Sequence, residues 1–515
     1  MPTRSANPTL PPPLAPALDK EAAYRALQTH DARFDGRLYV GVTSTGIYCR
    51  PICRVRLPKR ENCRFFLTPA RAEAAGFRPC LRCRPELAPG LARVALVDSS
   101  RALTQAGTRL LELALDRGEA VQLPAVAARL GVTERHFRRI FQAEHGVSPI
   151  QWLGTRRLLR AKQLLTDTPL PIAQVALAAG FSSLRRFNTA FRDHYRMAPQ
   201  ALRGPTPARP ASDTLRLFLP WRPPYDRAGM NRFLRARLLG GVEAWHDDHW
   251  WHTLTLANGA TGWLGLQLDA RREGAWLVLS SGLLPALPQV LRRVRHLLDL
   301  DAQPLDIAQA LGPLAAPRPG LRVPGCLDGF ETTVRIILGQ QVSVAAATTL
   351  AARLVQTLGT PCSTPVPGLG RHFPSPQALR DAAPERLGGL GLVRTRVAAL
   401  QALARAVTDE GLELSPDAIM DTTLARLRAL PGVGDWTCEM VALRVLAWPD
   451  AFPARDAGVL RALASHAPQA TQSHADAWRP WRSYAVMHLW QGLDPARSTT
   501  FAPSPAADPL LPDPA

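Results

Sequence analysis

The sequence contains no uninterrupted apolar run of the roughly 18 residues that a helix needs to cross a bilayer. Its proline-rich first 18 residues also lack the compact apolar core of a secretory signal. We therefore expect a cytoplasmic protein without membrane contact, where reducing conditions favour metal-bound or reactive thiols over disulfides for the eight cysteines. Acidic residues are scarce, since 42 Asp and Glu face 62 Lys and Arg. The formal charge of +20 favours a polyanionic partner, most simply nucleic acid.

Proline and small residues mark the joints between folding units in this chain of 515 residues. At roughly 150 residues a unit, the length corresponds to three or four units. Hydrophobic residues at 46% and charged residues at 20% exclude wholesale disorder. We predict disordered tails over 1–18 and 501–515, a cysteine-rich unit over 19–88, a helical basic unit over 98–203, a linker over 204–213 and a long unit over 214–500.

Four cysteines form two close pairs, Cys49 with Cys53 and Cys80 with Cys83, on either side of a loop. This arrangement can place four thiolates tetrahedrally around one Zn²⁺. By spacing alone, structural zinc is the favoured interpretation, and it would be enough to fold so small a unit. The loop is strongly basic and predicts a phosphate-binding surface beside the thiolates, formed by Arg50, Arg54, Arg56, Lys59, Arg60 and Arg64.

The sequence around these cysteines is more specific than their spacing. The segments FDGRLYVGVTSTGIYCRPICRVRLPKRENCRFF and AGFRPCLRCRPE resemble the N-terminal domain of the Ada protein of the adaptive response to alkylation damage. In that family the first of four zinc-bound cysteines accepts a methyl group from a DNA methylphosphotriester. The resemblance gives this role to Cys49, with Cys53, Cys80 and Cys83 as the other ligands of a single zinc ion. Cys63 matches no ligand position and is interpreted as a packing residue.

Methyl transfer to a zinc-bound thiolate would also change charge. Such a thiolate stays deprotonated yet nucleophilic, and methylation removes one unit of negative charge. Because phosphate contacts dominate DNA affinity, we expect methylation of Cys49 to act as an electrostatic switch for operator binding. The transfer consumes the cysteine, so this activity is stoichiometric.

Residues 121–203 contain one pattern twice: a short apolar helix, a glycine turn at Gly131 or Gly180, and a basic second helix. Thr133 and Ser182 are the predicted N-caps of the second helices. A glycine turn followed by a basic helix is the form that enters a major groove. The alternative is a basic helical bundle with solvated faces, which the duplicated turn disfavours.

Joined by a predicted helix over 150–165, the two modules resemble the all-α AraC-type DNA-binding domain. Ada proteins join their zinc domain to this domain. The resemblance therefore implies a bacterial, nucleoid-associated protein that binds an operator as a monomer and has RNA polymerase as a partner. Candidate DNA contacts in the two modules are Glu134, Arg135, Arg138, Ser183, Arg185, Arg186 and Asn188; Arg54 and Arg56 are candidates in the cysteine-rich unit. The PCHR motif of a second methyltransferase for O6-methylguanine is absent.

The last unit carries a glycine hairpin between two predicted helices, in LRALPGVGDWTCEMVALRVLAWPDAFPARDAGVLRAL. Gly432 and Gly434 let the backbone bend and turn its amides toward a phosphate. With Asp456 downstream, the segment resembles the helix-hairpin-helix glycosylases, specifically the AlkA-like 3-methyladenine DNA glycosylases. The resemblance places Asp456 on the catalytic aspartate, and Trp436 and Trp490 on aromatic positions of the base pocket.

The resemblance extends over the whole unit through LPWRPPYDRAGMNRFLRARLLGGVE, PGCLDGFETTVRIILGQQVSV and PWRSYAVMHLW. It implies a multidomain α+β protein, in which an α+β subdomain over 214–310 lies beside an all-helical domain over 311–500. The other tryptophans, Trp245, Trp250, Trp251 and Trp263, are interpreted as core residues.

Two absences narrow the implied chemistry, and two departures from the family pattern leave its substrate range open. Bifunctional relatives carry a lysine nucleophile where Trp436 stands, so a monofunctional glycosylase without strand cleavage is expected. The unit has no cysteine quartet after the catalytic region, so no iron–sulfur cluster is expected. Gln341 occupies the position of the family's apolar wedge, and Met440 replaces an aromatic pocket residue, which leaves the substrate range open.

The sequence therefore predicts an alkylation-damage sensor that accepts a methyl group, regulates repair genes, and excises alkylated purines such as 3-methyladenine and 7-methylguanine from double-stranded DNA. One alternative is a regulator whose glycosylase unit has decayed into a DNA-binding module, which the retention of Asp456 disfavours. Another gives the four cysteines only structural zinc.

Overall fold

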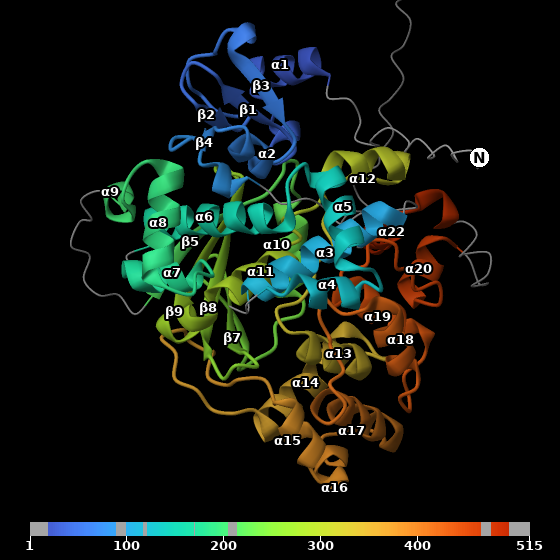
Figure 1. Ribbon diagram of the computed structural model, residues 1–515. Helices are drawn as coiled ribbons and strands as arrows, with labels where there is room; N and C mark the ends of the chain where they lie inside the picture. Colours follow the sequence, from blue (N-terminus) through green and yellow to red (C-terminus); the bar gives the residue numbers. More distant parts are fainter. Residues whose placement is uncertain are drawn as a thin grey trace, which may run out of the picture.

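The computed structural model describes residues 19–88, 99–116, 121–168, 170–203, 214–464 and 475–493. The predicted tails and the predicted linker over 204–213 lie outside these ranges. Within them the chain forms a multidomain α+β protein with two separate sheets (Figure 1). No helix among the described residues is both long and apolar enough to cross a membrane.

The cysteine-rich unit is a four-stranded sheet with two short helices, shown in blue in Figure 1. The strands lie in the order β3-β1-β2-β4, with β2 antiparallel to β1 and parallel to β4. This pairing brings the end of β2, at Cys49, next to the end of β4, where the second cysteine pair begins. The elements are α1 (Lys20–Gln28), β1 (Tyr39–Val42), β2 (Ile47–Cys49), β3 (Cys63–Phe66), α2 (Pro69–Ala74) and β4 (Arg78–Pro79).

The second unit is entirely helical and contains two helix-turn-helix modules joined by α6. Glycines at positive φ form both turns, at Gly131 (φ 68°) and Gly180 (φ 84°). Thr133 caps α5 as predicted, but Ser183 rather than Ser182 caps α8, because its hydroxyl accepts the amide N–H of Arg186 at 3.3 Å. The elements are α3 (Ser99–Asp116), α4 (Leu123–Arg129), α5 (Glu134–His145), α6 (Pro149–Asp167), α7 (Ile172–Ala178), α8 (Leu184–Tyr195) and α9 (Pro199–Arg203).

Helix α2 of the cysteine-rich unit contacts the second helix of each module. The carboxylate of Glu73 accepts a hydrogen bond from the Tyr48 hydroxyl at 2.9 Å and lies 3.3 Å from Nε2 of His194 on α8. Arg71 donates from Nε to the carbonyl of His145, at the end of α5, at 2.9 Å. The residue next to Cys49 is thus connected to a predicted DNA-reading helix through one carboxylate.

A five-stranded antiparallel sheet in the order β5-β9-β8-β7-β6 begins the C-terminal part. Its core side packs on α11, as the buried Leu264, Leu277 and Val290 show. Trp251 and Trp263 are half-exposed, and the centres of their rings lie 5.6 Å apart. The core interpretation was therefore wrong for these two. The elements are β5 (Thr214–Pro220), α10 (Arg227–Arg235), β6 (Glu243–His246), β7 (His249–Thr255), β8 (Thr261–Asp269), β9 (Gly274–Ser280), α11 (Leu287–Leu297) and α12 (Pro304–Leu311).

The remaining residues form a helical domain beside this sheet, coloured yellow to red in Figure 1. Its helices are α13 (Gly329–Leu338), α14 (Val344–Leu358), α15 (Pro376–Asp381), α16 (Pro384–Gly388), α17 (Arg394–Thr408), α18 (Met420–Arg428), α19 (Asp435–Arg444), α20 (Ala457–Ala462) and α22 (Arg482–Gly492). Short 3-10 helices lie at Ala32–Phe34, Arg60–Asn62, Pro85–Leu87, Ser281–Ala286, Gly312–Leu314 and Asp476–Trp478.

Candidate functional site

The four predicted zinc ligands converge in the first unit. The Sγ atoms of Cys49, Cys53, Cys80 and Cys83 all lie within 4.8 Å of one another. Backbone amides point at two of them: the N–H of Arg50 donates to Sγ of Cys83 at 3.3 Å, and that of Arg82 donates to Sγ of Cys80 at 3.4 Å. Four convergent sulfurs with amide donors match the preference of Zn²⁺ for tetrahedral thiolate ligands. The set fits one zinc ion.

The other residues of this unit divide into buried and exposed groups. Cys63 is buried on β3, where its thiol donates to the carbonyl of Lys59 at 3.4 Å, away from the sulfur cluster. Arg50 was predicted to face phosphate, but it is 6% exposed and its Nε donates to Oδ1 of Asp35 at 2.7 Å. Arg54 and Arg56 are exposed, so these two side chains remain available to a polyanion.

The predicted DNA contacts lie on the second helices of the two modules. Arg135 on α5 and Arg185 and Arg186 on α8 are exposed, whereas Asn188 is half-buried. Arg138 pairs with Glu134 at 2.7 Å, one helical turn earlier. The hydroxyl of Ser183 serves as a helix cap. The exposed arginines of both helices are therefore available for phosphate contacts, whereas Ser183 is used as a helix cap and Asn188 is half-buried.

Asp456 is held by four N–H donors at the start of α20. Its Oδ1 accepts hydrogen bonds from the amides of Gly458 at 2.9 Å and Val459 at 3.1 Å, as an N-cap does. Two indoles complete the set: Nε1 of Trp490 donates to Oδ1 at 2.8 Å, and Nε1 of Trp436 donates to Oδ2 at 3.0 Å. The carboxylate is therefore fixed in one orientation between two aromatic rings from α19 and α22.

These three side chains line a cleft of about 400 Å³ between the five-stranded sheet and the helical domain. Met440 lies on the same wall, one turn after Trp436. Phe233 of α10 and Trp250 of β7 also line the cleft. Trp250 is buried, as its core interpretation predicted, but neither residue was predicted to have a place in the pocket. Phe233 lies inside a segment that carried the family resemblance, but an apolar residue on an amphipathic helix is ordinarily a core residue, so nothing local marked it.

Two arginines that line the cleft, Arg237 and Arg444, contact the ring of Phe233. The guanidinium of Arg237 lies 3.9 Å from the centre of the Phe233 ring, and that of Arg444 lies 4.7 Å from it. Burial lowers the pKa of Arg444 to about 9, with the neighbouring Arg237 contributing in the same direction. Phe233 is thus held in place by two cation–π contacts, from arginines that line the same cleft.

The predicted phosphate-binding hairpin and the turn at the predicted wedge position adjoin residues that line this cleft, Trp436 and Val342. Gly432 has a φ of 73° in the hairpin between α18 and α19, and Gly434 is the exposed N-cap of α19. Gln341 is exposed at the tip of the turn between α13 and α14, with a φ of 56°. Both turns use left-handed backbone, which is ordinary for glycine and strained for glutamine.

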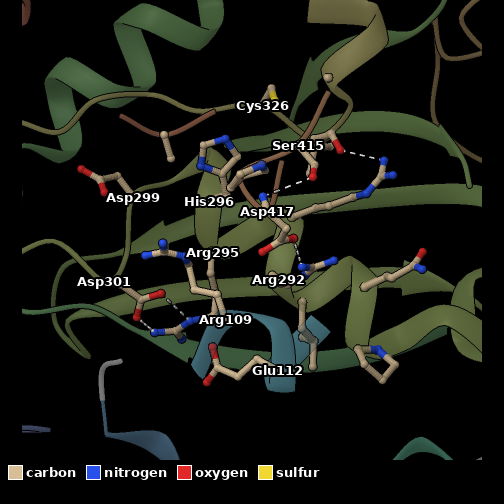
Figure 2. A pocket seen from close by; sticks show the side chains of 18 of the residues that line it. Arg109, Glu112, Arg292, Arg295, His296, Asp299, Asp301, Cys326, Ser415 and Asp417 are labelled. Atoms are coloured by element: carbon tan, nitrogen blue, oxygen red, sulfur yellow. Dashed lines mark hydrogen bonds and ion pairs between the residues drawn. The ribbon is translucent and has the colours of Figure 1, made fainter. Parts of the chain in front are cut away.

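A larger cavity, of about 1290 Å³, lies where the first two units meet the C-terminal part. Figure 2 shows some of the side chains that line it, including Arg292 and Arg295 from α11. Arg292 forms an ion pair with Asp417, and Nε of Arg295 donates to Oδ2 of Asp301 at 3.2 Å. Asp456 does not line this cavity. The smaller cleft, which is lined by Asp456, Trp436 and Trp490, is the better candidate for a base pocket.

Four family models match successive parts of the chain. They are the metal binding domain of Ada over residues 22–86, a helix-turn-helix domain over 126–204, the AlkA N-terminal domain over 215–328, and the HhH-GPD superfamily base excision DNA repair protein over 334–482. The thiol cluster falls in the first match and Asp456 in the last.

Three known proteins are similar to this chain over different shares of its length. The chain is 39% identical over 495 residues to a probable bifunctional transcriptional activator/DNA repair enzyme AlkA of Mycobacterium tuberculosis, covering 92% of this chain and 97% of the relative. It is 37% identical to DNA-3-methyladenine glycosylase 2 of Escherichia coli, over 53% of this chain and 95% of that one. The bifunctional activator Ada of Escherichia coli is 36% identical over 32% of this chain and 44% of its own length. This chain therefore belongs to the family of bifunctional transcriptional activators and DNA repair glycosylases of the Ada/AlkA type.

Proposed function

We propose that the glycosylase part hydrolyses the N-glycosidic bond of alkylated purines, with Asp456 as its catalytic carboxylate. The observation that carries this proposal is the position of Asp456 between the indoles of Trp436 and Trp490 in the 400 Å³ cleft. A carboxylate fixed between two aromatic rings suits an extruded, positively charged base and a sugar that gains positive charge as the base leaves.

The reaction needs little activation of its leaving group. Alkylation at N3 or N7 gives the purine a positive charge, so the bond from C1′ to the base breaks with its electron pair moving to the base. Asp456 stabilises the positive charge that develops on the sugar, and water then bonds to C1′ and loses a proton. Trp436 stands where bifunctional relatives carry a lysine, so the chain has no amine there for strand cleavage. Met440 makes the pocket wall more adaptable than an aromatic ring would.

Base release from duplex DNA that contains 3-methyladenine, 7-methylguanine or another damaged base tests this proposal. Wild-type protein should release alkylated purines, and Asp456→Asn should release almost none under the same conditions. Absence of release by wild-type protein over the whole panel would leave the regulator with a decayed glycosylase as the better account.

We further propose that Cys49 accepts methyl from a DNA methylphosphotriester. Bound zinc would keep the four thiolates deprotonated at neutral pH. Sγ of Cys49 then forms a bond to the methyl carbon, the bond from that carbon to the phosphate oxygen breaks, and a phosphodiester leaves. Arg54 and Arg56 are placed to contact neighbouring phosphates. Because only 6% of Cys49 is exposed, we expect methyl to transfer faster than larger alkyl groups.

Mass spectrometry of the protein after incubation with methylphosphotriester DNA tests this step. One methyl group should appear on the peptide that contains Cys49, and none after Cys49→Ala. Cys63→Ala is the matched control, since Cys63 is a buried cysteine of the same sheet that lies outside the sulfur cluster. Unmodified Cys49 in the wild-type protein would leave zinc with a structural role only.

The regulatory role follows from charge. Methylation of Cys49 removes one negative charge beside the exposed arginines of the first unit, and DNA affinity should rise as a result. We propose that the methylated chain binds its operator as a monomer through α5 and α8 and recruits RNA polymerase. Equal operator affinity before and after methylation, at one fixed salt concentration, would refute the switch.

A further inference from the structure

Three elements that would handle the damaged nucleotide meet at one side chain. They are the turn between α13 and α14, whose tip is Gln341, the hairpin with Gly432, and the first turn of α19, which carries Trp436. The side chain between them is that of Gln340, which neither the sequence pattern nor the cleft singled out.

The contacts of Gln340 use its amide group and its backbone. The side-chain nitrogen Nε2 donates to the carbonyl of Gly432 at 2.9 Å and to Oγ1 of Thr437 at 2.9 Å. The backbone carbonyl of Gln340 accepts a hydrogen bond from Nη2 of Arg396 on α17 at 2.7 Å. Both hydrogens of the amide can therefore be used, one on the hairpin and one on the helix that presents Trp436.

The neighbouring residue needs this support. Gln341 has a φ of 56°, a conformation that costs an L-residue roughly 1–2 kcal/mol, and its side chain is exposed. Among the described residues, no hydrogen bond from the side chain of Gln341 holds the backbone in this conformation. Gln340 and Arg396 hold the backbone on the inner side of the turn, so that Gln341 is presented on the outer side.

We propose that Gln340 is a positioning residue that couples the phosphate-anchoring hairpin to the turn that enters the duplex. The proposal rests on the glycosylase function proposed above. The hairpin fixes the DNA backbone, the turn fills the space left by the extruded base, and α19 receives that base. A single glutamine amide sets the spacing of all three, and misplacement by about 1 Å can cost a factor of about one hundred in rate.

This role separates DNA binding from base extrusion. Gln340→Ala leaves the amides of the hairpin and the cations of the DNA-facing surface in place, so affinity for undamaged duplex should change less than threefold. The turn loses its link to the hairpin, so the extruded state should become rarer. A merely structural glutamine would instead lower affinity and extrusion together, or neither.

The test uses the full-length protein and a duplex with 2-aminopurine next to a tetrahydrofuran abasic site. Insertion of the turn unstacks the 2-aminopurine and raises its fluorescence, and no base has to be released. At saturating protein we expect a clear rise with wild type, and less than a third of that rise with Gln340→Ala. Gln340→Glu, which keeps the length but lacks the amide hydrogens, should behave like the alanine variant.

Gln401→Ala is the matched control, because Gln401 on α17 is a glutamine whose Nε2 also donates to a backbone carbonyl, that of Ala382 at 2.8 Å. It should keep the wild-type rise, and thermal unfolding of each variant checks that it is folded. An undiminished rise with both Gln340 variants would overturn the proposal, as would a loss of duplex affinity equal to the loss of fluorescence. Should wild type insert the turn but release no damaged base, the glycosylase proposal would fail while the coupling stood.

Discussion

Replacing Asp456 by asparagine removes one negative charge and keeps the shape of the side chain. The amide oxygen of asparagine can occupy the position of Oδ1 and accept the N–H groups of Gly458, Val459 and Trp490. Helix α20 should therefore keep its cap, and the fold should survive. The amide nitrogen then faces Nε1 of Trp436, so that two donors meet where a hydrogen bond of 3.0 Å stood.

The loss has an electrostatic part and a hydrogen-bond part. Two unit charges about 4 Å apart interact by about 4 kcal/mol at an effective dielectric constant of about 20, which bounds the stabilisation of a cationic sugar by Asp456. That energy corresponds to a factor of about one thousand in rate. The bond to Trp436 contributes about 1.5–3 kcal/mol to orientation, because its acceptor is charged.

Single-turnover release of 7-methylguanine from duplex DNA separates the two parts. Asp456→Asn should slow release about a thousandfold. Trp436→Phe keeps an aromatic side chain but loses the N–H together with the smaller ring of the indole, and it should slow release about tenfold to a hundredfold. Equal losses in the two variants would mean that orientation and not charge matters. An Asp456→Asn protein with more than a tenth of the wild-type rate would refute the electrostatic reasoning.

Three further predictions concern stability and DNA affinity. Gly432→Ala forces a side chain into a backbone with a φ of 73° and should destabilise the hairpin by about 1–2 kcal/mol. Duplex affinity, measured by fluorescence anisotropy, should fall as a result. A fall no larger than that caused by Gly388→Ala, where the added methyl group meets no neighbouring atom, would contradict this prediction. Burial lowers the pKa of His488 from 6.5 to about 4. The unfolded chain then binds more protons between these values, so the free energy of unfolding should fall by about 2 kcal/mol from pH 7 to pH 5, and His488→Gln should flatten that slope in denaturant titrations. Glu73→Gln weakens a carboxylate that is 7% exposed and joins the first two units; chemical denaturation should show a loss of about 1.5–3 kcal/mol, and a loss as small as that of the exposed Glu61→Gln would argue against the link.

Local sequence was informative wherever chemistry needs neighbouring residues. The spacing of Cys49, Cys53, Cys80 and Cys83 predicted a four-sulfur cluster, and the structure brings the four sulfurs together. Glycine turns with a following N-cap predicted the two modules, apart from the shift of one residue from Ser182 to Ser183. These features depend on backbone geometry within a few residues, which composition and spacing can express.

Residues brought together by packing were not predicted. Phe233 and Trp250 reach the cleft only because α10 and β7 pack against the helical domain, and nothing in their own segments requires that. Arg50 was assigned to the surface from the charge of its segment, but Asp35, in the loop before β1, pairs with it inside the fold. Gln340 contacts Gly432 across a long stretch of chain, and its neighbours in sequence give no sign of it.

The domain bounds and the roles of individual DNA contacts stay predictions, because exposure shows only that a side chain is available.

The roles of Cys49 and Asp456 are tested together most directly by incubating the full-length protein with an excess of methylated duplex DNA, and counting both free purine and methylated protein over time. Free alkylated purine should accumulate beyond one molecule per chain, while methylation should stop at one group per chain, on Cys49. Purine release that ends at or below one per chain, or a Cys49 that stays unmodified, would contradict the account.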